Sequence, residues 1–204
     1  MTQLDVDPAK PKLGRKRDHT RDPEILEAAL DVLAETGYDG MTIDMVAARA
    51  KAGKATLYRR WSSKGDLVVD AVACMKSVDL TTLPDTGTLR GDLVAMIRPH
   101  SIDDAQRKLK IMTGLLTMLS KDPELSDTAM AAIMQPRVEA NKILLRRAVD
   151  RGEIPASTDI DTLAVVSQAM ATYRVMILRR PVDREFILSV IDGVVLPAVG
   201  LSDR

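Results

Sequence analysis

Aromatic residues, cysteine and long apolar runs are all scarce in this sequence. Five of the 204 residues are aromatic (three Tyr, one Trp and one Phe) although 46% are hydrophobic, so Leu, Ile, Val, Ala and eleven Met must build the core, which favours helices. The single cysteine, Cys74, excludes an internal disulfide and suits a reducing compartment. No apolar run is long enough to cross a bilayer, and the basic N-terminus leads into no apolar signal-peptide core. We therefore expect a helical, cytoplasmic protein with no membrane partner.

Net charge is also absent, because 29 basic residues balance 29 acidic ones. The balance hides a local excess, since residues 45–64 contain six basic side chains and no acidic one. These six are Arg49, Lys51, Lys54, Arg59, Arg60 and Lys64. A polyanionic partner such as nucleic acid should therefore contact the N-terminal third of the chain.

The patterning of the chain predicts an all-α protein of three segments. Residues 1–21 are basic and lack apolar periodicity, which predicts a flexible arm. The apolar pattern of residues 22–66 predicts short helices, and that of residues 67–204 predicts a helical body. About nine helices are expected in all. The expected helices cover residues 22–37, 43–50 and 54–61, a fourth that Ser63 and Asp66 open, and then 88–98, 103–120, 124–151, 160–179 and 184–196. Pro136 should kink the 124–151 helix near Gln135.

The two short helices at 43–50 and 54–61, joined by a turn at residues 51–53, are typical of a helix-turn-helix motif. At about 100° per residue, Leu57 and Trp61 should point into the protein. An Arg side chain can donate two parallel hydrogen bonds to guanine, and the methyl groups of Ala and Thr can contact thymine. The candidate base-reading residues on the outward side are Ala55, Thr56, Arg59 and Arg60, with Lys54 and Tyr58 on its flank.

Contacts to DNA phosphates are a separate function. Thr42 and Lys64 stand at helix N-termini, where free backbone N–H groups favour an anion. Tyr58 and Lys54 can clamp the same strand. In the arm, Arg15, Lys16 and Arg17 either enter a minor groove or add counterion release, and a solubilising tail is the alternative explanation.

Residues 42–50 (TIDMVAARA), 54–61 (KATLYRRW) and Ser63 with Lys64 resemble the DNA-binding domain of TetR-type bacterial transcriptional regulators. The resemblance implies an all-helical homodimer on a palindromic operator, usually a repressor that releases DNA when a small molecule enters the C-terminal body. It also implies that Tyr58 and Lys64 contact phosphates. The residues that it places near bases are Lys54, Ala55, Thr56 and Arg60.

Two positions in the turn depart from the family pattern. The family generally has Gly at the end of the first short helix and Ser at the start of the second, where this chain has Lys51 and Gly53. A left-handed Lys51 would cost about 1 to 2 kcal/mol, unless Gly53 takes up the turn instead.

The helices at 160–179 and 184–196 are apolar on more than one face, so they need two packing partners. A second copy of the chain is the simplest second partner and predicts a two-fold, four-helix interface. A wholly internal core is the alternative. The candidate interface residues are Val166, Met170, Tyr173, Ile177, Phe186, Val190 and Val194.

Methionines on the central helices suggest a largely apolar effector pocket, because Met adapts its shape to a ligand. Filling of core gaps is the alternative. The candidate pocket residues are Met96, Met112, Leu116, Met130, Met134 and Met170. Arg107, Arg137 and His100 are possible contacts for an acidic effector, although solvated helix faces also explain them.

No catalytic, metal or cofactor motif is present. His19 and His100 are isolated, so they form neither a metal site nor a Cys/His pair with Cys74. We expect Cys74 to be a small buried hydrophobe, with redox sensing as the alternative. The sequence therefore predicts a ligand-responsive transcriptional repressor and not an enzyme. The alternatives are a DNA-binding dimer without effector control, and a helical small-molecule or protein-binding module with a vestigial DNA-reading motif.

Overall fold

The computed structural model describes residues 22–97 and 102–201. The predicted arm, with Arg15, Lys16 and Arg17, lies outside the described residues, and so does His100. Helices are the only regular secondary structure in the described part of the chain, which confirms the all-α prediction.

Four helices form the N-terminal end of the molecule: α1 (Asp22–Gly40), α2 (Ile43–Arg49), α3 (Lys54–Tyr58) and α4 (Lys64–Lys76). Helical geometry is interrupted inside α1 at Gly37, which has φ 68° and ψ 173°, where the sequence predicted a helix end. Thr42 caps α2 by accepting a hydrogen bond from the Met45 N–H at 3.2 Å. Ser63 and Asp66 form the reciprocal capping box that starts α4.

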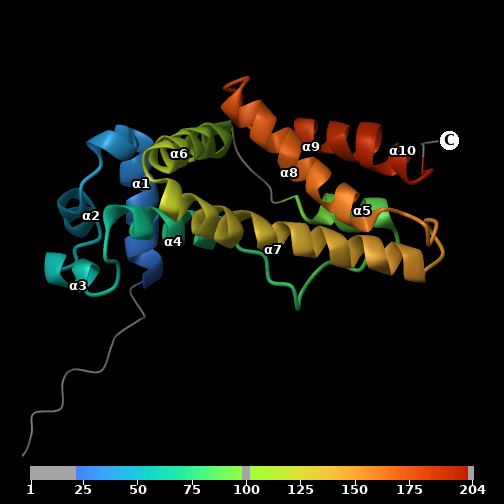
Figure 1. The fold of residues 1–204 in the computed structure, drawn as a ribbon, viewed down its shortest axis with the longest axis horizontal. Helices are drawn as coiled ribbons and strands as arrows, with labels where there is room; N and C mark the ends of the chain where they lie inside the picture. Colours follow the sequence, from blue (N-terminus) through green and yellow to red (C-terminus); the bar gives the residue numbers. More distant parts are fainter. Residues whose placement is uncertain (1–21, 98–101, 202–204) are drawn as a thin grey trace, which may run out of the picture.

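Longer helices make up the body. They are α5 (Leu89–Ala95), α6 (Ile102–Lys121), α7 (Pro123–Asp150), α8 (Ile160–Met176), α9 (Arg184–Val190), the π-helical η1 (Ile191–Val195) and α10 (Leu196–Ala198). Helix α7 continues through Pro136. Figure 1 shows α1 to α4 at one end of the molecule, α8 to α10 towards the other, and α7 running along both.

One buried apolar cluster joins the N-terminal helices to the body. It contains Leu33 of α1, Leu57 of α3 and Val68 of α4 together with Leu115 of α6 and Ile133 of α7. A Cβ atom at Gly114 of α6 would lie 2.7 Å from Leu33 Cδ1, so a larger residue there would force the Leu33 side chain of α1 to shift. The predicted boundary after residue 66 thus falls inside α4, and the core continues across it.

A second apolar cluster holds α5, α7, α8 and η1 together, and a polar network closes it at one end. Asp92 of α5 is fully buried, accepts hydrogen bonds from the Thr86 N–H at 2.6 Å and hydroxyl at 2.8 Å, and pairs with Arg151 at 3.2 Å. Glu153 accepts a hydrogen bond from the Leu89 N–H at 2.8 Å, which satisfies the start of α5. The buried carboxylate is therefore paired and hydrogen-bonded, as a stable core requires.

Cys74 is exposed, so the prediction that it is buried is wrong. Cys74 lies on the same face of α4 as Leu67 and Ala71. Those two residues, nearer the start of the helix, are buried, whereas Cys74 is not. In the last turn, Met75 and Lys76 take the inward side, and both line a cavity in the body.

Candidate functional site

Helix α3 is anchored by the two residues that its periodicity predicts to be internal. Leu57 is fully buried and Trp61 is 6% exposed. The indole Nε1–H of Trp61 donates a hydrogen bond to the Asp70 carboxylate of α4 at 2.8 Å, so the ring has a polar partner as well as an apolar contact. The anchored side fixes which side of α3 faces outward.

The outward side of α3 carries exposed Lys54, Ala55, Tyr58 and Arg59. Arg59 Nη2 donates to the Thr56 hydroxyl at 3.2 Å, and Thr56 itself is partly buried. The Arg59 guanidinium therefore lies at the surface next to a methyl and a hydroxyl group. Those are the groups that read base edges in a major groove.

Lys54 lies at the start of α3 in an exposed ion pair. Its Nζ is 2.7 Å from Asp44 Oδ1 and 5.9 Å from the centre of the Tyr58 ring. The hydrogen bond to Asp44 is the main cause that raises the pKa of Lys54. Exposed ion pairs are weak, so a phosphate or base edge can replace the carboxylate.

Arg60 occupies a different place from the one predicted. Its guanidinium pairs with the Asp22 carboxylate at the start of α1, and its side chain is only 17% exposed. The pair ties the end of α3 to α1. The predicted base-reading role of Arg60 is therefore incompatible with this arrangement, since the guanidinium reaches DNA only after the pair opens.

Lys64 also turns inward instead of towards a phosphate. Its Nζ donates to the carbonyl oxygens of Tyr38 at 2.7 Å and Met41 at 3.0 Å, and it lies 4.2 Å from the centre of the Tyr38 ring. These contacts hold the turn between α1 and α2 against the start of α4. Thr42, in contrast, is exposed at the N-terminus of α2.

In the turn between α2 and α3, Lys51 is the residue with the strained backbone conformation. Lys51 has φ 48°, in the left-handed region, whereas Gly53 is extended with φ −70° and ψ 134°. Lys51, and not Gly53, therefore adopts the left-handed conformation, although glycine adopts it at lower cost.

A cavity of about 210 Å³ lies in the body and is lined by residues of α4 to α9 and η1. A buried water needs roughly 10 to 15 Å³ of such volume, so the cavity is far larger than a packing gap. Five of the six predicted pocket residues line it: Met96, Met112, Leu116, Met130 and Met134. The prediction for Met170 is wrong, because Met170 is absent from the lining and is 36% exposed on α8.

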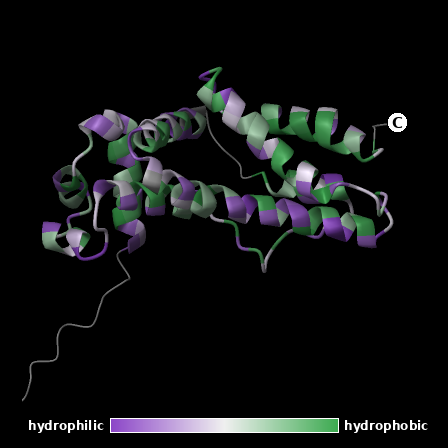
Figure 2. Cartoon of the chain, in the orientation of Figure 1, coloured by the Kyte–Doolittle hydropathy of each residue, from purple (hydrophilic) through white to green (hydrophobic). Residues whose placement is uncertain are grey.

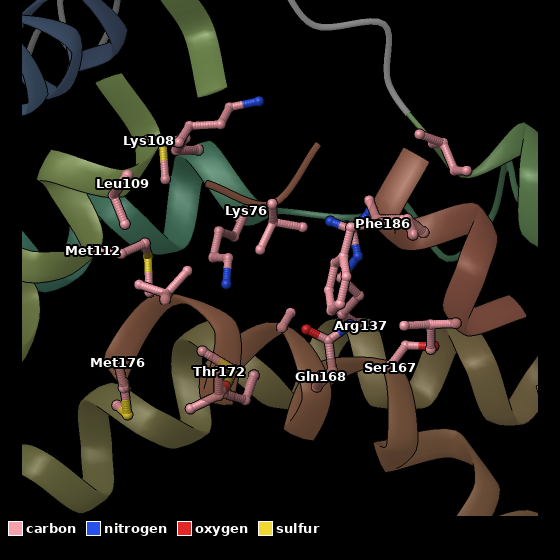
Figure 3. Close-up of a pocket in the computed structure, with 18 of the residues that line it drawn as sticks. Lys76, Lys108, Leu109, Met112, Arg137, Ser167, Gln168, Thr172, Met176 and Phe186 are labelled. Atoms are coloured by element: carbon pink, nitrogen blue, oxygen red, sulfur yellow. The ribbon is translucent and has the colours of Figure 1, made fainter. Parts of the chain in front are cut away.

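Three cationic residues line the same cavity. Arg137 was a candidate in the sequence, whereas Lys76 and Lys108 carried no signal that distinguished them from solvated lysines. Figure 3 shows the Lys76 side chain pointing into the space bordered by Met112, Thr172 and Phe186. Burial, and then the charges of Arg137 and Lys108, lower the pKa of Lys76 to about 8. Arg107 lies elsewhere, paired with Glu27 at 2.6 Å and with Asp31 at 2.7 Å on α1.

Exposed apolar side chains gather on α8 and η1. Met170, Tyr173, Ile177 and Val194 are all exposed, Ile177 by 65%, while Val166 is partly buried. Figure 2 shows hydrophobic residues along much of α8 to α10.

Two predicted interface residues face inward instead. Val190 is 2% exposed and Phe186 is partly buried, and both line the cavity. Phe186 also packs against the Arg174 guanidinium, 4.4 Å from the ring centre. The assignment of Val190 to an intermolecular surface is therefore wrong, whereas Phe186 contributes at least part of its side chain to the cavity.

No helix in the described ranges has the length and hydrophobicity needed to cross a membrane. Among the same residues, no group of three or more His, Cys, Asp or Glu side chains is placed to hold a metal ion.

The helix-turn-helix and the helical body each match a known family. Residues 25–71 match a family model described as bacterial regulatory proteins of the tetR family, and residues 83–194 match one described as a tetracyclin repressor-like C-terminal domain. The chain is 34% identical over 180 residues to an uncharacterized HTH-type transcriptional regulator of Mycobacterium tuberculosis, covering 88% of each chain. It is also 34% identical over 180 residues to the DNA-binding transcriptional repressor TetR of Mycobacteroides abscessus, covering 88% of this chain and 94% of that one.

Solved structures share the fold. The TetR family transcription regulator SCO0332 superposes with a TM-score of 0.61 at 24% identity, covering 92% of this chain and 100% of that chain. The regulator FadR from Bacillus subtilis, in complex with stearoyl-CoA, superposes with a TM-score of 0.58 at 16% identity, covering 88% and 98%.

Fold and motif together define a helix-turn-helix DNA-binding protein. The chain belongs to the TetR family of bacterial transcriptional regulators, with its DNA-binding domain at the N-terminal end. Members of this family regulate transcription and are not enzymes.

Proposed function

We propose that the protein is a homodimeric repressor that binds a palindromic operator and dissociates from it when a small molecule enters the body cavity. One observation carries this proposal: α4 begins at the DNA-binding helices and ends with Met75 and Lys76 at the cavity. A relative named as a transcriptional repressor and a fold neighbour crystallised with stearoyl-CoA support it. We further infer that the protein acts in the bacterial cytoplasm, where its DNA lies.

On DNA, the outward side of α3 reads the sequence. Arg59 is the main base reader, with Ala55, Thr56 and Lys54 beside it, because these residues lie on or next to the surface opposite Leu57. Tyr58 and Thr42 bind phosphates from exposed positions at either end of the motif. Lys64 supports this surface by holding the turn before α2.

Dimerisation uses the exposed apolar side chains of Met170, Tyr173, Ile177 and Val194, together with the partly buried Val166, on α8 and η1. A two-fold axis through this surface pairs α8 with its copy. Two α3 helices at a fixed spacing then match two half-sites of a palindrome.

Release follows if the liganded and free shapes of the body differ in the spacing of the two α3 helices. A ligand that binds one shape better shifts the population towards it, and operator affinity changes by the same coupling energy. Helix α4 carries the change because it begins at Lys64, which carbonyl oxygens hold, and ends at Lys76, which lines the cavity.

Selection from a pool of random DNA duplexes with the full-length protein tests the DNA-binding half of the proposal. We expect enrichment of sites with two inverted half-sites. Absence of any enriched sequence would contradict sequence-specific binding, and a single unsymmetrical half-site would contradict the dimeric mode.

Fluorescence anisotropy of the selected operator, titrated with fractionated small-molecule extracts, tests the effector half. We expect at least one fraction to lower operator affinity in a saturable way. A compound that saturates the cavity and leaves operator affinity unchanged would support instead a DNA-binding dimer without effector control.

A further inference from the structure

The body cavity combines an apolar lining with positive charge. Lys76 of α4, Lys108 of α6 and Arg137 of α7 all line it, and none of its described lining residues is acidic. Three like charges around one cavity repel one another, and the repulsion is strongest where water is excluded. An anion next to Lys76 would offset part of this repulsion.

Lys76 is the residue that most needs such a partner. It is partly buried, its ammonium group points into the cavity, and no described acidic side chain pairs with it. Burial of a cation without a counter-ion is unfavourable unless the charge is lost or paired. Its pKa of about 8 leaves it mostly charged at neutral pH, so the charge is retained and unbalanced.

The remainder of the lining suits a hydrocarbon chain. Met112, Leu116, Met130 and Met134 come from α6 and α7, and their unbranched or flexible side chains adapt to a ligand without a fixed shape. The volume of about 210 Å³ has room for many more atoms than a small inorganic anion contains. A ligand that fills the cavity must therefore be mostly apolar and still carry a negative charge.

We propose that the cavity binds an anionic amphiphile, an aliphatic chain ending in a carboxylate or a similar acidic group. The acidic group lies between Lys76 and Arg137, and the chain lies along the methionines of α6 and α7. This inference rests on the proposed effector function, because it names the chemical class of ligand for the same cavity. It also makes Lys76 the point at which the ligand acts on α4.

Isothermal titration calorimetry of the full-length protein with decanoate, 1-decanol and decylamine tests the proposal, since the three probes share one chain length and differ in head group. We expect decanoate to bind about tenfold or more tightly than 1-decanol, as one unscreened ion pair allows. Decylamine should bind most weakly. Equal affinities for decanoate and 1-decanol, or no decanoate binding, would overturn the proposal.

Variants identify the group responsible for the preference. Lys76→Met keeps the length of the side chain without its charge, and we expect the preference for decanoate to fall to about threefold or less. Lys76→Arg should keep the preference, and so should Lys110→Met, which removes an exposed lysine of α6 outside the cavity. An undiminished preference in Lys76→Met would refute the assignment.

Failure of this inference can be told apart from failure of the proposed function, because the calorimetry contains no DNA. Lys76-dependent decanoate binding that leaves operator affinity unchanged would support the anion site and contradict the effector role. Operator release by a neutral compound, together with no preference for decanoate, would overturn the anion site and leave the effector role standing.

Discussion

At the scale of single residues, the turn between α2 and α3 depends on a lysine in the left-handed region, at φ 48°. Replacing Lys51 with Gly should raise the free energy of unfolding by about 0.5 to 1 kcal/mol, because relief of roughly 1 to 2 kcal/mol of strain is partly offset by the greater chain entropy of glycine. Chemical denaturation at fixed protein concentration measures the change. Lys51→Ala keeps the Cβ atom and loses the charge, so an equal gain in that variant would contradict the strain explanation.

Lys76 makes stability depend on pH. Its pKa falls from 10.5 to about 8 on folding, so between these values the unfolded chain binds more protons and the folded protein gains stability as pH rises. Lys76→Met lacks this dependence. It should be more stable than the wild type by about 2 to 3 kcal/mol at pH near 7, and the difference should shrink towards pH about 10.

Urea unfolding of both proteins at the two pH values measures this difference. Lys110→Met serves as the control, because that lysine is exposed and lies outside the cavity. A stability difference between Lys76→Met and the wild type that stays constant with pH would show that the charge of Lys76 is not its cause.

At the scale of secondary-structure elements, the start of α4 supports the DNA-binding helices through Lys64. Lys64→Ala should lower the free energy of unfolding by about 1.5 to 3 kcal/mol, since it leaves the Tyr38 and Met41 carbonyl oxygens without their charged donor. Thermal unfolding measures the loss. Lys54→Ala removes an exposed lysine of the DNA-binding helices, whose exposed ion pair is weak, and should leave the midpoint almost unchanged. If Lys64→Ala were as stable as Lys54→Ala, the inward role of Lys64 would be refuted.

The local pattern of the elements could be predicted from the sequence. The side of α3 that carries Leu57 and Trp61 follows from helical periodicity, and the capping box at Ser63 and the break at Gly37 follow from residue types. The positions of polar side chains that bridge distant segments could not be predicted. Arg60 meets Asp22 and Lys64 meets Tyr38 across more than one helix, and neither periodicity nor spacing encodes such contacts.

The dependence on packing between distant segments also explains why some residues of the body were assigned wrongly from the sequence. Helical spacing placed Phe186 and Val190 on an apolar stripe, but which stripe faces the cavity depends on the packing of α9 against α8. Lys76 and Lys108 could be distinguished from solvated lysines only once α4 and α6 were placed around one space.

At the scale of the whole molecule, the exposed apolar side chains of α8 predict the oligomeric state. Ile177→Asp should convert a dimer to a monomer at micromolar concentration, because two carboxylates would be buried without partners at a cost of several kcal/mol, or about 100-fold or more in the dissociation constant. Sedimentation velocity measures the change. Leu80→Asp alters another exposed hydrophobic residue, outside α8 to α10, and should remain dimeric. A dimeric Ile177→Asp protein would place the interface elsewhere.

The central claim is that α3 reads DNA sequence through its outward side, with Arg59 as the principal reader. Its most direct test is the affinity of wild type and Arg59→Ala for the selected operator and for a scrambled duplex of equal length, at one salt concentration. We predict a loss of about 1 to 3 kcal/mol on the operator and a much smaller loss on the scrambled duplex. Equal losses on the two duplexes would assign Arg59 to the phosphate backbone and contradict the claim.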